Sequence, residues 1–86
     1  MIDAKRAARA AMSYFQEMGA ETGHPPVNVS LEEVERSKDG RSWLITLGYY
    51  EDSASAVFSA LSKRYKVFQV DAASGEVLSM KIRPVG

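Results

Sequence analysis

The chain has 86 residues, of which eleven are basic and eleven acidic, so its formal net charge at pH 7 is zero. This length fits one domain spanning residues 1–86. Electroneutrality argues against sequence-independent nucleic-acid binding, because that activity uses an excess of Lys and Arg to displace counterions. The absence of cysteine excludes disulfides, thiolate nucleophiles and cysteine-ligated zinc sites.

The N-terminal segment predicts one helix from Asp3 to about Met18. Its apolar side chains recur at helical spacing: Ala4, Ala8, Ala11, Met12, Phe15 and Met18. Asp3 is the expected N-cap, since its carboxylate can accept from the first-turn amides, and Gly19 is the expected C-terminal stop. The small alanines indicate that the helix lies close against a sheet.

The same segment lacks the continuous apolar region of a secretory signal, because Lys5, Arg6 and Arg9 interrupt it. No apolar run in the sequence approaches the length that spans a bilayer. We therefore expect no signal peptide, no membrane partner and a cytoplasmic location.

The stretch "AETGHPPVN" predicts a loop, since Pro25 and Pro26 exclude helix and the interior of a sheet. The following strand, "VNVSLEEVERS", alternates with Val27, Val29 and Leu31 on one face. Val34 breaks that parity, which predicts a bulge or a fraying strand end near Glu32 and Glu33.

Asp39-Gly40 predicts a tight turn into the next strand, "RSWLITLGYYE". Alternation there places one set of side chains toward the helix: Trp43, Ile45, Leu47 and Tyr49. The segment from Asp52 to Lys63 is predicted to be a partly ordered loop.

The stretch "YKVFQVDAASGEVLSMKIRP" predicts a final pair of strands around a polar centre. The side chains expected to face the helix are Phe68, Val70, Leu78, Met80 and Ile82. At the polar centre, Asp71, Ser74 and Glu76 offer oxygen ligands for calcium or magnesium, but two carboxylates are few for such a site. A hairpin turn explains them better, with Asp71 accepting from backbone amides and Gly75 taking a positive φ.

The expected fold class is α+β: one N-terminal helix packed on a four-stranded antiparallel sheet, in the order α-β-β-β-β. The closing stretch "VFQVDAASGEVLSMKI", after a helix and earlier strands, resembles PepSY-type domains, and the whole resembles cystatin-like folds. A weaker likeness is to small accessory proteins of gas vesicles. The PepSY resemblance implies a binding or inhibitory module, of a kind often associated with peptidases, and it carries over no catalytic residue.

No constellation in the sequence predicts catalysis. Glu33 and Glu35 are expected on one face of their strand and Glu32 on the other, so no compact carboxylate pair forms. His24, the only histidine, is expected on an exposed loop with no metal-ligating or catalytic residue beside it. We therefore expect no enzyme activity, no cofactor, no metal, and no catalytic or cofactor-binding residue.

The most informative feature is the sheet face opposite the helix, which is richer in apolar and aromatic residues than a solvated face. The predicted interaction face consists of Leu44, Thr46, Tyr50, Tyr65, Val67, Lys81 and Arg83. We expect a protein partner or self-association, as a homodimer, through this face or an edge strand. The alternative is a nucleic-acid-binding accessory protein, with bases stacking on Tyr50 and Tyr65 and phosphates bound by Lys81 and Arg83.

Overall fold

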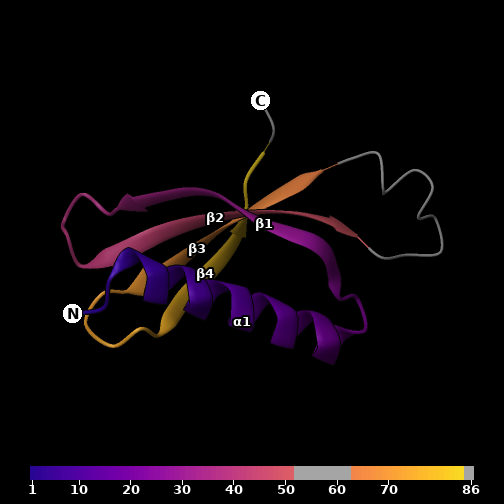
Figure 1. Ribbon diagram of the computed structural model, residues 1–86, viewed down its shortest axis with the longest axis horizontal. Coiled ribbons are helices and arrows are strands. Elements are labelled where there is room, and N and C mark those ends of the chain that lie inside the picture. Colours follow the sequence, from indigo (N-terminus) through magenta and orange to yellow (C-terminus); the bar gives the residue numbers. More distant parts are fainter. Residues whose placement is uncertain (52–62, 85–86) are drawn as a thin grey trace.

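The computed structural model describes residues 1–51 and 63–84 and confirms the α+β layout (Figure 1). Its elements are α1 (Ala4–Thr22), β1 (Pro26–Arg36), β2 (Ser42–Glu51), β3 (Arg64–Asp71) and β4 (Val77–Ile82). The loop predicted at Asp52–Lys63 lies outside the described residues except for Lys63.

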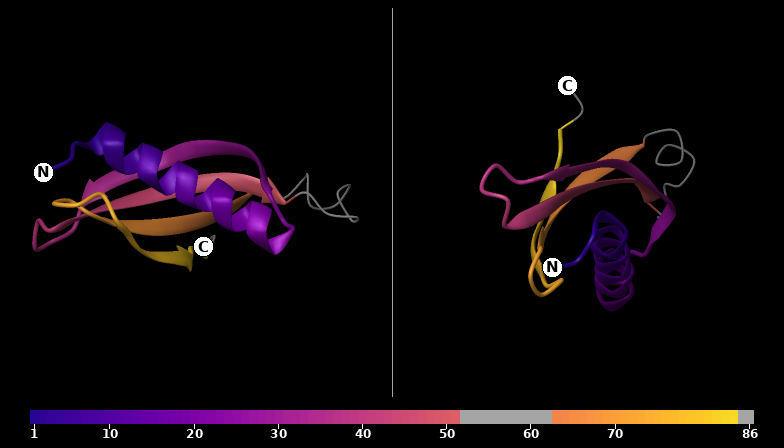
Figure 2. Two further views of the ribbon diagram at one scale, coloured as in Figure 1. Left: turned by 90° about the horizontal axis from the view of Figure 1, so that it is seen from below. Right: turned by 60° about the vertical axis from the view of Figure 1, so that its left-hand side comes forward.

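The four strands form one antiparallel sheet in the order β1-β2-β3-β4, so β1 and β4 are its edges. The sheet is twisted and curls around α1, which lies against its concave side (Figure 2). We call the side toward α1 the inner face and the opposite side the outer face. Across residues 1–51 and 63–84, no helix is long and apolar enough to cross a membrane.

The core lies between α1 and the inner face. Its buried side chains are Ala7, Ala11, Phe15, Ile45, Leu47, Tyr49, Phe68 and Val70. Phe15 meets Tyr49 edge to face, with ring centroids 4.8 Å apart, and packs at 5.4 Å from Phe68. The expected inward set of β2 is confirmed, with Trp43 partly buried against this core.

The two ends of α1 differ in how well they were predicted. Asp3 is the N-cap, accepting from the Arg6 amide at 2.9 Å, as expected. The predicted stop at Gly19 is wrong, because the helix continues to Thr22 and ends at Gly23, whose φ is 78°. Instead, the missing side chain of Gly19 lets Pro26 pack closely against the helix, because a Cβ there would lie 2.6 Å from Cδ of Pro26.

The buried stripe of α1 also differs from the predicted one. The residues fully turned to the sheet are spaced four apart: Ala7, Ala11, Phe15 and Gly19. The remaining members of the predicted stripe are only partly buried: Ala4, Ala8, Met12 and Met18. The contact face therefore includes Ala7 and Gly19, neither of which belongs to the predicted stripe.

β1 contains the predicted bulge between Leu31 and Glu33, and a second irregularity between Val27 and Ser30. Asn28, in the second one, has a φ of 53°. This irregularity reverses the parity, so Val27 pairs with Tyr50 on the outer face while Leu31 pairs with Leu47 on the inner face. The expectation that Val27 shares a face with Leu31 is therefore wrong.

The inward set predicted for β4 needs a correction as well. Val77, not Leu78, packs against the core, because a register shift opposite Val70 leaves Leu78 without a partner in β3. Leu78 is 51% exposed. Ile82 pairs with Lys66 but is 77% exposed. Met80 packs against the core as predicted.

We expect Gly19→Ala to destabilise the protein by about 1–3 kcal/mol, because the new methyl group overlaps Pro26. Helix propensity alone would favour alanine over glycine by about 1 kcal/mol. Urea unfolding of the variant measures the change, with Gln16→Ala on the exposed side of α1 as the control. A more stable Gly19→Ala would show that the helix moves away from the proline without cost.

Candidate functional site

The polar centre of the β3–β4 connection is a turn, as predicted. The amide and the hydroxyl of Ser74 both donate to Oδ2 of Asp71 at 2.8 Å, and Gly75 has a φ of 80°. These bonds, the hydroxyl bond first, lower the pKa of Asp71. The side chain of Asp71 is thus occupied within the turn. In the described part of the chain, no group of three or more His, Asp or Glu side chains lies close enough together to hold a metal.

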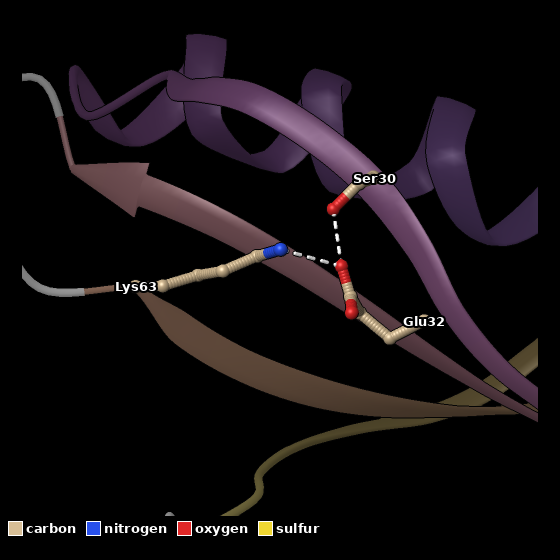
Figure 3. A network of polar contacts seen from close by, with 3 residues as sticks. All are labelled: Ser30, Glu32 and Lys63. Carbon is tan, nitrogen blue, oxygen red and sulfur yellow. Dashed lines mark hydrogen bonds and ion pairs between the residues drawn. The ribbon is translucent and has the colours of Figure 1, made fainter.

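Glu32 takes part in a small polar network that joins β1 to Lys63, the residue before β3 (Figure 3). Its Oε2 accepts from Nζ of Lys63 at 2.7 Å and from Oγ of Ser30 at 2.5 Å. The network passes over Gly48 of β2, where a Cβ would lie 2.9 Å from Oε2 of Glu32 and 2.6 Å from Cε of Lys63. A side chain at position 48 would therefore displace the ends of Glu32 and Lys63 from their present positions.

The bulge changes where the acidic side chains lie. The carboxylate of Glu32 lies over Gly48 on the outer face, and Glu33 pairs with Thr46 on the same face. The expectation that Glu32 is on the opposite face from Glu33 is therefore wrong, because the extra residue in β1 offsets the alternation. Glu32 forms an ion pair with Lys63, and Glu33 forms one with Arg83. These ion pairs explain why two carboxylates lie on the same face.

Arg83 follows β4 and extends across the outer face. Its Nη1 donates to Oε1 of Glu33 at 3.0 Å and lies 3.3 Å from Oγ1 of Thr46. The contact links the β4 side of the sheet to β1, the opposite edge strand. Thr46, beneath the guanidinium, is only 3% exposed.

The sheet register brings the predicted interaction face together on the outer side. Thr46, Val67 and Lys81 lie side by side across three strands. Of the seven residues, only Lys81 and Arg83 are exposed; Thr46 is buried, and the other four are half-buried: Leu44, Tyr50, Tyr65 and Val67. The outer face is therefore less open than the sequence suggested.

The exposed large apolar side chains lie elsewhere. Those that the structure describes are Met1, Val27, Leu31, Leu78 and Ile82. None belongs to the predicted interaction face, and two of them belong to β4. Sequence alternation missed Leu78 and Ile82 because it assigned both to the core.

The backbone of β4 is open on one side. The Arg83 amide donates to the carbonyl of Tyr65 at 3.0 Å, which makes Arg83 and Tyr65 a hydrogen-bonded pair. Since such pairs alternate along an antiparallel ladder, Met80 and Ile82 direct their N–H and C=O groups away from β3. No strand among the described residues pairs with that side.

A cavity of about 260 Å³ lies where the inner face ends beside β4. It is lined by Tyr49, Arg64, Tyr65, Lys66, Ile82, Arg83 and Pro84. Nζ of Lys66 lies 5.5 Å from the ring centre of Phe15 and 5.9 Å from that of Tyr49. Ile82 therefore lines this cavity and also belongs to the open edge strand β4.

We expect the carboxyl of Glu32 to titrate below its ordinary pKa of 4.5, because Lys63 and then Ser30 donate to its ionised form. NMR titration of the Glu32 carboxyl carbon measures this, and Lys63→Met should raise the pKa more than Ser30→Ala. The contribution of the network to stability is present above the unfolded pKa and is lost as the pH falls through the folded pKa. An unchanged Glu32 titration in Lys63→Met would contradict the assignment.

Comparison of the chain with protein-family models, with curated proteins and with solved structures found no match. The resemblance to PepSY-type domains over residues 65–82 stays a prediction. What the protein does is therefore inferred from its own geometry.

Proposed function

We propose that this protein is a non-catalytic binding or inhibitory module that acts through the open edge of β4. An extended segment of a protein partner adds there as a further strand. The observation that carries the proposal is the combination of outward backbone groups at Met80 and Ile82 with the exposed side chains of Leu78 and Ile82. In strand addition, backbone hydrogen bonds supply affinity and flanking side chains supply specificity.

The contrast between the two edges of the sheet supports this choice. β1 begins at Pro26, which has no amide hydrogen, and Asn28 has a positive φ within the irregularity between Val27 and Ser30. Bulges and acidic side chains such as Glu33 and Glu35 are features that discourage edge pairing. In β4, the residues from Ser79 to Ile82 pair regularly with β3 and include no proline. β4 is therefore the edge with the geometry to accept a strand.

The nucleic-acid alternative receives less support from the outer face. Arg83, one of its two phosphate-binding residues, is paired with Glu33. Glu35 pairs with Leu44 on the same face, so carboxylates lie where phosphates would have to approach. Like charges there oppose binding of a polyanion.

The proposal is tested with a displayed library of random heptapeptides selected on the purified protein. We expect enrichment of extended sequences rich in β-branched and aromatic residues, and at least tenfold weaker binding of the selected peptides to Leu78→Lys. The matched control is Leu31→Lys on β1, because Leu31 is 49% exposed and Leu78 is 51% exposed. Equal losses in both variants would contradict the proposal, as would enrichment of no peptide by a monomeric protein.

A further inference from the structure

We infer that the strand added to β4 is β4 of a second copy, in an antiparallel pair whose two-fold axis passes through Met80. This inference rests on the proposed function and names its partner. The reason is that the outward backbone groups of the edge can pair with those of a second copy, in a register that sets apolar residues opposite each other and keeps the two Lys81 side chains apart.

The direction of the N–H and C=O groups along β4 limits the registers in which a second strand can pair with it. Met80 and Ile82 direct their N–H and C=O groups outward, whereas Lys81 and Arg83 direct theirs to β3. A two-fold axis at Met80 makes the two Met80 residues a hydrogen-bonded pair, in which each amide donates to the other carbonyl. The outward groups of both Met80 residues thereby acquire partners.

The side chains select this register over its neighbour. With the axis at Met80, Ile82 of one copy lies opposite Leu78 of the other, so the two most exposed apolar residues of β4 occupy opposed positions of the pair. Lys81 then lies opposite Ser79. Moving the axis to Lys81 also satisfies the backbone, but it sets two lysines directly opposite each other, which is destabilising.

The two-fold axis is perpendicular to the sheet, because antiparallel strands paired in this way keep their faces in common. The two four-stranded sheets therefore join into one, with both copies of α1 on the same side. In the right-hand view of Figure 2, the chain at the C-terminal end of β4 leads away from α1.

Light scattering coupled to size exclusion tests association. We expect the protein to be a dimer at high concentration, Leu31→Lys to remain one, and Leu78→Lys to dissociate at least tenfold more readily. Circular dichroism verifies that both variants are folded. A monomer at every concentration, or equal weakening by both substitutions, would overturn the inference.

Cysteine cross-linking tests the register, since the chain has no cysteine of its own. Under mild oxidation, Met80→Cys should form a disulfide-linked dimer, because residues paired across the axis have Cα atoms about 5.5 Å apart. Lys81→Cys is the matched control and should form much less. Preferential linking of Lys81→Cys, or linking of neither variant, would overturn the Met80-centred pair.

The outcomes separate this inference from the proposed function. A monomeric protein whose selected peptides still depend on Leu78 would overturn the dimer and leave strand addition standing. A monomeric protein that selects no peptide would overturn both. A dimer that is dispersed by the selected peptides would support both, since the peptide and the second copy then compete for one edge.

Discussion

The close approach of α1 to the sheet is the contact on which the rest of this structure depends. Ala7, Ala11 and Gly19 are small, so Phe15 projects from the helix into the rings of Tyr49 and Phe68. Pro26 packs directly on Gly19, which fixes where β1 begins relative to the helix. One helix fills the concave side of the sheet, and the convex side and both edges have to be stabilised by other means.

Among the described residues, charged side chains rather than a second helix or sheet lie over the outer face. Glu32 and Lys63 cross above Gly48, and Arg83 lies over Thr46 to reach Glu33. Exposed ion pairs of this kind contribute little energy each, but their aliphatic stems cover apolar strand surface. The residues beneath this cover, Gly48 and Thr46, are both buried.

Much of the architecture was predictable from local chemistry. The order of the elements, the Asp3 cap, the Asp71–Gly75 turn and the bulge at Glu32 all follow from short stretches of sequence. The failures involve residues whose role depends on contacts distant in the chain. Gly19 was predicted to end the helix because its packing against Pro26 cannot be read from a linear sequence. Leu78 resembled a core residue because alternation assumes an uninterrupted register.

The sequence by itself determined the helix, the strands and their turns, because capping, alternation and glycine geometry act within a few residues. It also determined that β4 carries large apolar side chains. Only the tertiary structure decided which of them are exposed, since exposure depends on the register against β3 and on how far α1 extends over the sheet. The same long-range pairing decided that β4 is an open edge, and an edge is a property of strand order that no single segment encodes.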